Sequence, residues 1–290
     1  MIAYARGAAD MKGYLACVLS LIDRMAGASL KIPIHLAFSH DEEVGCIGVR
    51  SLIKELENRL VKPRFAIVGE PTLMRIATGH KGKIAARATC CGIAGHSALA
   101  PKALNAIHLA CDFVGLIRQS QEEIACGASR DEDYEIPYTT VHVGRIDGGT
   151  ALNIVPNQCT VDFEIRNIGQ DNARTVLDQI LDRAAKIAIR QRALFPAADI
   201  RVDVLNSYPG LVTASDEEVV NFVSKIVEHP QPLKVAFGTE GGLFSTRLGV
   251  PTVVCGPGSM DQGHKPNEFV AVSQLEACDR MMDRLLKECC

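Results

Sequence analysis

The chain has 290 residues, of which 47% are hydrophobic and 22% charged, and its formal net charge at pH 7 is −3. This composition is typical of a globular protein with one large domain or two ordinary ones, and it excludes disordered, collagen-like and coiled-coil chains. With no basic excess, no Trp and few aromatic residues, no nucleic-acid partner is expected. No run approaches the ~20 apolar residues of a membrane span and the N-terminus lacks a signal-peptide pattern, so we expect no membrane partner.

The first part of the chain alternates helix and strand patterns. Helical spacing of apolar residues predicts helices over 11–26 and 49–60, and short apolar runs predict buried strands at 33–39 and 64–68. Helices between consecutive strands favour right-handed crossovers and a largely parallel sheet.

The pattern changes near residue 80. Alternation of polar and apolar residues with period two predicts strands that have one wet face and pair antiparallel. The expected strands of this region are 80–92, 138–146, 159–168 and 198–205. The expected helices are 103–117 and 172–193. We therefore expect an inserted α+β domain at 82–206.

Alternating helices and strands resume after Pro209-Gly210. The expected helices are 215–228, 241–248 and 272–288, and the expected strands are 233–237 and 250–255. The simplest architecture is an α/β domain built from 1–81 and 207–290 and interrupted by the inserted domain.

Eleven cysteines are spread along the chain. Their number is odd, no C-x-x-C spacing occurs, and Cys90-Cys91 and Cys289-Cys290 are adjacent pairs, which fits neither a zinc finger nor a disulfide framework. Most lie in apolar runs, as do Cys17, Cys111, Cys255 and Cys278, so we interpret them as buried thiols in a reducing cytoplasm.

Acidic residues and one histidine occupy the loops between these elements. In an open α/β sheet such loops converge beyond the carboxyl ends of the strands, where ligands bind. Taken singly, each residue has a structural explanation, as a helix cap, a charge near a helix N-terminus or a turn residue. Taken together, carboxylates and an imidazole fit a site for zinc or a first-row neighbour such as cobalt. The set is Asp10, Glu42, Glu43, Glu70 and His264.

The adjacent pair Glu42-Glu43 adds a reaction type. Neighbours in a strand face opposite sides, so one carboxylate can bind a metal while the other stays free as a base. A free glutamate beside a metal site is what metal-assisted hydrolysis requires.

Four segments also stand in the order and spacing of a known family. They are RGAADMKG (6–13), SHDEEVG (39–45), VGEPT (68–72) and GPGSMDQGHKPNE (256–268). The chain resembles the co-catalytic zinc amidohydrolases and exopeptidases, which include acetylornithine deacetylase, succinyl-diaminopimelate desuccinylase, aminoacylase and glutamate carboxypeptidase. The resemblance covers essentially the whole chain, and the segments DEEVGCIGVRSL and GEPTLMRIATGHKGK are most similar to the bacterial acetylornithine deacetylase branch.

The resemblance implies a metal centre with two zinc ions. Asp10 would bridge them, Glu43 and His264 would complete one, Glu70 would bind the other, and Glu42 would be the general base. The implied reaction is hydrolysis of the amide bond of an N-acyl amino acid, here N-acetylornithine to ornithine and acetate in arginine biosynthesis. Other activities of the family remain alternatives.

The resemblance also assigns the inserted domain as a dimerisation or lid domain, so a homodimer through 82–206 is expected. Within it, His96 would polarise the scissile carbonyl in the partner's active site. Asn153 and Arg166 would meet the carboxylate end of the substrate, although Asn153 alternatively caps a turn and Arg166 is alternatively a strand-edge charge. In the α/β domain, Gly238 and Thr239 would contact the substrate.

One departure from the family concerns the second metal. The family carries a His-x-Asp motif ahead of the bridging aspartate, and these 290 residues contain none. We therefore expect one of the two zinc ions to be weakly held or absent, with His40 as an alternative ligand.

A non-catalytic interaction protein on the same fold is the alternative from another class. A nucleotide enzyme is disfavoured because Pro257 removes an N–H from the Gly-rich loop.

Overall fold

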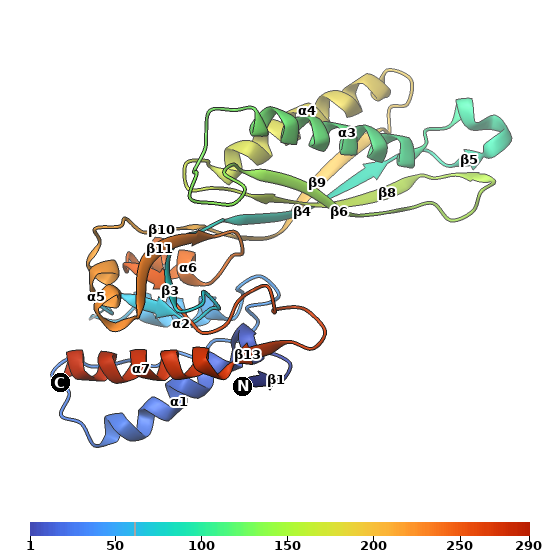
Figure 1. The fold of residues 1–290 in the computed structure, drawn as a ribbon. Coiled ribbons are helices and arrows are strands. Elements are labelled where there is room, and N and C mark those ends of the chain that lie inside the picture. The colour runs from blue at the N-terminus through green and yellow to red at the C-terminus, as the bar shows by residue number, and fades with distance from the viewer. Residues whose placement is uncertain (61) are drawn as a thin grey trace. The chain divides into compact units, whose positions relative to one another are not determined.

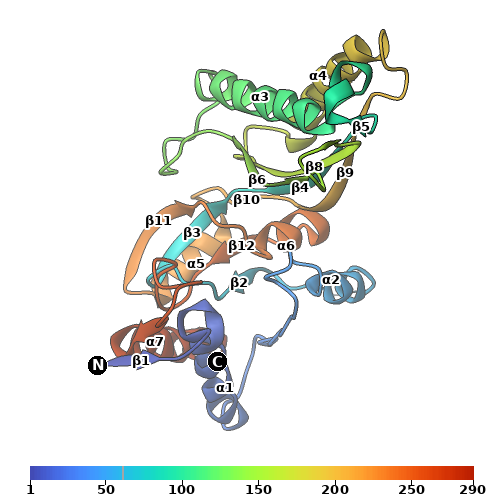
Figure 2. The same ribbon diagram turned by 90° about the vertical axis from the view of Figure 1, so that its right-hand side faces the viewer.

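The computed structural model describes residues 1–60 and 62–290, which divide into two compact units (Figures 1 and 2). Unit 1 consists of residues 1–80 and 210–290, and unit 2 of residues 81–209. The boundaries fall at 80/81 and 209/210, where the sequence prediction had 81/82 and 206/207. None of the described helices combines the length and the apolar character that crossing a membrane requires.

Unit 1 contains a five-stranded sheet with mixed pairing. The parallel pairs are β12–β2 and β11–β3, and the antiparallel pairs are β12–β3 and β10–β3. Strand β3 leads directly into unit 2 and β10 returns directly from it, so these two strands run in opposite directions. The α/β class is as predicted, but the sheet is less parallel than the sequence suggested. The strands are β2 (Ala66–Val68), β3 (Arg75–His80), β10 (Leu211–Val212), β11 (His229–Val235) and β12 (Thr252–Val254).

Helices pack on this sheet and bury its side chains. Helices α1 and α7 lie side by side (Figures 1 and 2) and share with α5, β3 and β12 a core that includes Leu21, Ile76, Val253 and Met281. Helices α2 and α6 contact each other elsewhere in the unit. The helices are α1 (Gly13–Ala26), α2 (Val49–Glu57), α5 (Glu218–Ile226), α6 (Gly241–Leu248) and α7 (Val272–Cys289).

A separate two-stranded sheet in unit 1 joins the two ends of the sequence. Strand β1 (Ile2–Tyr4) pairs antiparallel with β13 (Phe269–Ala271), with Tyr4 opposite Phe269. This pairing places residues 5–12 beside the loop that precedes β13, and a kinked helical turn (η1, Ala8–Lys12) follows before α1 begins.

Several predicted elements of unit 1 need correction, among them strand 233–237, which is observed as β11 (His229–Val235). Residues 33–39 form no strand, and Phe38 is 50% exposed. No strand among the described residues pairs with this segment. An apolar run needs such a partner strand to satisfy its backbone hydrogen bonds. Helix α2 ends at Glu57 instead of residue 60. Strand β3 was not predicted, since residues 76–80 are buried on both faces and show no alternation.

Unit 2 is a four-stranded antiparallel sheet with two helices over one face (Figures 1 and 2). Alternate residues of β8, including Val161, Phe163 and Ile165, are buried and share a core with Phe113 and Leu177 of the helices. The strand order is β6 (Thr140–Gly148), β8 (Gln158–Arg166), β4 (Lys83–Cys91) and β9 (Asp199–Tyr208), and the helices are α3 (Ala106–Ala125) and α4 (Ala173–Arg192).

All eleven cysteines are free thiols. Seven of them are buried, Cys17, Cys255 and Cys278 included. Cys111 is exposed on α3, contrary to the expectation that its apolar neighbours would bury it.

Candidate metal centre

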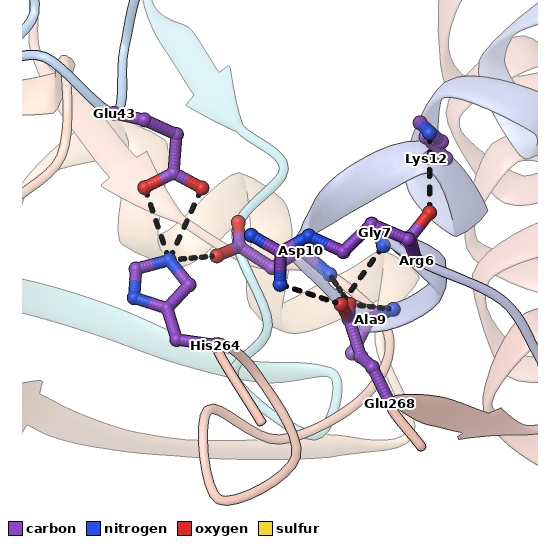
Figure 3. Close-up of polar contacts among 8 residues, drawn as sticks. All are labelled: Arg6, Gly7, Ala9, Asp10, Lys12, Glu43, His264 and Glu268. Carbon is purple, nitrogen blue, oxygen red and sulfur yellow. Dashed lines mark hydrogen bonds and ion pairs between the residues drawn. The ribbon is translucent and has the colours of Figure 1, made fainter. Parts of the chain in front are cut away.

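Three side chains that the sequence singled out meet in unit 1 (Figure 3). The ligand atoms of Asp10, Glu43 and His264 all lie within 4.8 Å of one another. The Nε2 atom of His264 is 3.0 Å from Asp10 Oδ2 and 3.0 Å from Glu43 Oε2. Two carboxylates and an imidazole at this spacing form a donor set that suits zinc or a neighbouring first-row metal.

The turn before α1 presents Asp10. Its backbone is not helical (φ −121°, ψ 88°), and its N–H donates to the carboxylate of Glu268 at 3.0 Å. The same carboxylate accepts from the N–H of Gly7 at 2.8 Å and of Ala9 at 3.0 Å (Figure 3). The β1–β13 pairing brings these distant segments together, so the position of Asp10 depends on long-range structure.

Glu42 and Glu43 lie at the start of a tight turn. The carbonyl of Glu42 accepts from the N–H groups of Gly45 and Cys46, each at 2.8 Å. The half-buried side chain of Glu42 accepts from Cys46 Sγ at 3.3 Å, whereas the exposed side chain of Glu43 reaches His264. The two carboxylates therefore diverge, although a turn and not the expected strand is the cause.

Negative charge is concentrated around this turn. Burial, followed by the charges of Asp10 and Glu42, raises the pKa of Glu70 well above its usual value, and Glu70 hydrogen-bonds to Asp10. Burial and the charge of Glu43 likewise raise the pKa of Asp10. A bound cation would reduce the electrostatic repulsion among carboxylates crowded in this way.

His264 lies between the two carboxylates of this cluster. Burial lowers its pKa, but the hydrogen bond to Glu43 and the charges of Glu43 and Asp10 outweigh burial and raise the pKa. Its imidazole therefore contacts both carboxylates at the position where a metal ion would bind. The residues present fit a metal ion.

His40 lies outside this group. Its side chain is 74% exposed, and its Nδ1 is 3.1 Å from Asp41 Oδ2. Among the described residues, the cluster of side chains that could hold a metal ion consists of Asp10, Glu43 and His264. Neither His40 nor Glu70 belongs to it.

The loop with Gly238 and Thr239 is held by one hydrogen bond within it and one to His80. Thr239 is fully buried, and its Oγ1 accepts from the N–H of Gly241 at 3.0 Å. The N–H of Gly242 donates to the Nε2 atom of His80 at 3.1 Å. The buried side chain of Thr239 therefore stabilises the conformation of this loop.

Glu240 in the same loop is an acid that the sequence did not single out. It is 8% exposed, one carboxylate oxygen accepts from Ser39 Oγ at 2.8 Å, and the other is buried without a hydrogen-bond partner in the described part of the chain. Burial raises its pKa to about 7; the charge of Glu42 acts in the same direction, against the Ser39 hydrogen bond. Glu240 thus links this loop to the segment before Glu42.

Two predicted residues of unit 2 lie together at a small exposed sheet. Strand β5 (Gly95–His96) pairs with β7 (Ile154–Val155), with His96 opposite Ile154. The N–H of Ser97 donates to the carbonyl of Asn153 at 3.0 Å, and His96 and Asn153 are both exposed. Their side chains are available for contacts with another molecule.

Arg166 lies elsewhere in unit 2, at the end of β8. Its Nε and Nη2 atoms donate to Glu164 at 3.0 and 3.3 Å, and its Nη1 donates to the hydroxyl of Tyr208 at 3.0 Å. Lys83 also contacts Glu164, at 3.2 Å. A substrate carboxylate that binds Arg166 would therefore have to share its guanidinium with Glu164.

Glu268 and Glu240 are the polar residues that sequence reasoning missed. Glu268 is the last residue of the segment 256–268, and Glu240 directly follows Gly238 and Thr239, so these neighbours were the available signal. Residue spacing, however, does not reveal which N–H or hydroxyl a distant carboxylate contacts.

The chain is similar to known proteins in sequence and in fold. The model of peptidase family M20/M25/M40 matches residues 2–288. The chain is similar to acetylornithine deacetylase of Myxococcus xanthus (35% identity) and of Pasteurella multocida (30%), in each case over 99% of this chain and 72% of the relative. Its fold is similar to that of a tripeptidase from Staphylococcus aureus, with TM-score 0.75, 21% identity, and coverage of 97% of this chain and 72% of the other.

Proposed function

The chain belongs to peptidase family M20/M25/M40, and we propose that this metallohydrolase cleaves the amide bond of N-acetylornithine to release acetate and ornithine. The coarser part, a metal-dependent hydrolase of N-acyl amino acids, follows from the family and from relatives at 30 and 35% identity. The specific substrate is suggested by the names of those relatives.

The observation that carries the proposal is the convergence of the ligand atoms of Asp10, Glu43 and His264 within 4.8 Å, with Glu42 next to Glu43 in the chain. The first three side chains would hold a zinc ion, or cobalt in its place. Glu42 is next to a ligand in the chain but points away from it, toward Cys46. This leaves one carboxylate near the metal centre without a metal-binding role.

A bound zinc ion would polarise the scissile carbonyl and lower the pKa of water. Glu42 would accept a proton from the attacking water as the new C–O bond forms. The same carboxyl group would return that proton to the amine nitrogen as the C–N bond breaks, which yields acetate and the free amino group.

We further propose a homodimer through residues 82–206. The exposed tip of unit 2 carries His96 and Asn153 beside apolar side chains, with Leu152 101% and Ile154 44% exposed. In this arrangement His96 of a second copy would donate a hydrogen bond to the carbonyl oxygen. Asn153 and Arg166 would bind the carboxylate of the substrate.

A second metal is proposed to bind weakly. Asp10 and Glu70 would be its ligands, and two carboxylates without an imidazole hold zinc less firmly than the group of three. The eleven free thiols, seven of them buried, suit a reducing compartment, so we place the enzyme in the cytoplasm.

The test is metal content per chain, followed by hydrolysis of N-acetylornithine beside N-succinyl-diaminopimelate. We expect bound zinc, faster release of acetate than of succinate, and loss of turnover in Glu42→Gln. If zinc is bound but succinate is released faster than acetate, the protein is a metal-dependent hydrolase, and the proposal that N-acetylornithine is its substrate is refuted. No zinc and no hydrolysis would favour a non-catalytic protein on the same fold.

A further inference from the structure

We propose that Glu268 is a positioning residue that shapes the Gly7–Asp10 backbone so that the carboxylate of Asp10 faces the metal site. This inference rests on the proposed metal centre and is independent of which amide is hydrolysed. Glu268 itself contacts no reacting group in the proposed reaction.

The carboxylate of Glu268 is surrounded by backbone N–H groups (Figure 3). Its Oε2 accepts from Gly7 at 2.8 Å, and its Oε1 accepts from Ala9 and Asp10, each at 3.0 Å. The side chain is 2% exposed. Three N–H groups from a four-residue stretch that converge on one anion form a backbone nest, here filled by a side chain of the protein itself.

The backbone at this turn is irregular. Gly7 has φ 76°, and Asp10 departs from helical geometry just before α1. Without the carboxylate, three N–H groups next to a buried chain segment would lack an acceptor, and an unpaired buried N–H is costly. The carboxylate therefore selects this conformation over a regular helical turn, in which Asp10 would point elsewhere.

Charge attraction does not explain the position of Glu268. Its contact with Arg6 is 3.4 Å, and the Arg6 side chain is 70% exposed, which makes the pair weak. The negative charge of Glu268 also acts against ionisation of Asp10. A carboxylate that opposes the charge of its neighbour yet binds three N–H groups around it serves backbone geometry.

Glu268→Gln tests this geometry with little change in shape. The amide has one acceptor oxygen and an NH2 group, and the NH2 group would face at least one backbone N–H. Glu268→Asp keeps both acceptors on a shorter side chain. Arg6→Gln removes the weak ion pair alone. Val270→Ala is the stability control, because Val270 is 2% exposed on β13 and its truncation loosens the same region without touching the nest.

The experiment measures zinc affinity of the full metal-free chain by competition with a zinc indicator, together with thermal unfolding in EDTA. We expect Glu268→Gln to weaken the tight zinc site ~10–100-fold, as loss of a residue that orients a ligand does. Glu268→Asp should recover part of this loss. Arg6→Gln and Val270→Ala should retain wild-type zinc affinity, although Val270→Ala unfolds at a lower temperature.

Wild-type zinc affinity in Glu268→Gln would overturn the inference, as would an equal loss of affinity in Val270→Ala, which would make the effect one of stability. If Glu268→Gln does not fold, Glu268→Asp decides: unchanged affinity refutes the positioning role and reduced affinity supports it. Absence of zinc binding by the wild-type chain refutes both the inference and the metal centre. Zinc binding without amide hydrolysis would sink only the proposed reaction.

Discussion

Replacing Glu240 by Gln should change how the stability of the chain depends on pH. Burial raises the pKa of Glu240 to about 7, from the ordinary 4.5. The folded state therefore binds a proton on Glu240 between these two values, where the unfolded state has released it. Stability from this group is complete below the unfolded pKa and is lost as the pH rises through the folded pKa.

The size of the effect follows from the two pKa values. At about 1.4 kcal/mol per pH unit, the whole difference corresponds to about 3 kcal/mol of unfolding free energy, most of which falls between pH 5 and pH 8. Gln does not titrate, so Glu240→Gln should lack this loss. One Glu240 oxygen lacks a hydrogen-bond partner among residues 1–60 and 62–290. It adds an offset that does not depend on pH, so the test concerns the slope.

The assay is urea unfolding of the wild type and Glu240→Gln at about pH 5, 6, 7 and 8, in EDTA so that metal binding does not contribute. The unfolding free energy of the variant minus that of the wild type should rise by about 2–3 kcal/mol across this range. Glu55→Gln, which removes an exposed glutamate on α2, should give a flat difference. A flat difference for Glu240→Gln as well would refute the argument that burial holds a proton on this group.

Three further predictions concern the metal centre and the assembly. Glu42→Gln should keep bound zinc and lower turnover ~10²–10⁴-fold, because it removes a base, whereas Glu43→Gln should lower zinc affinity. Equal zinc loss in both variants, measured by metal analysis, would mean that the roles of Glu42 and Glu43 are wrongly assigned. Sedimentation at micromolar concentration should show a dimer through residues 82–206, and a monomer would also remove the role of His96 in a second copy. Zinc titration should show one tight and one weak event; two equally tight events would point to a recruited ligand, with His40→Ala as the first variant to examine.

Local sequence patterns were sufficient for most elements of unit 2. Alternating residues such as those of β8 reveal which face is buried, because one face of that sheet meets helices and the other does not. The same rule failed for β3, which is buried on both faces, and for residues 33–39, whose apolar character carries no information about whether a partner strand exists.

The identities of Asp10, Glu43 and His264 were readable in the sequence, because metal chemistry restricts ligand types and the loops that carry them follow from the order of helices and strands. That the three meet within 4.8 Å was decided by the tertiary structure. Only that structure also reveals the role of Glu268, which accepts a hydrogen bond from the N–H of Asp10, 258 residues away. The same holds for Glu240, which accepts from the hydroxyl of Ser39, 201 residues away. The physical reason is that a propensity or period acts over a few neighbouring residues, whereas a hydrogen bond between distant segments forms only after packing has brought them together.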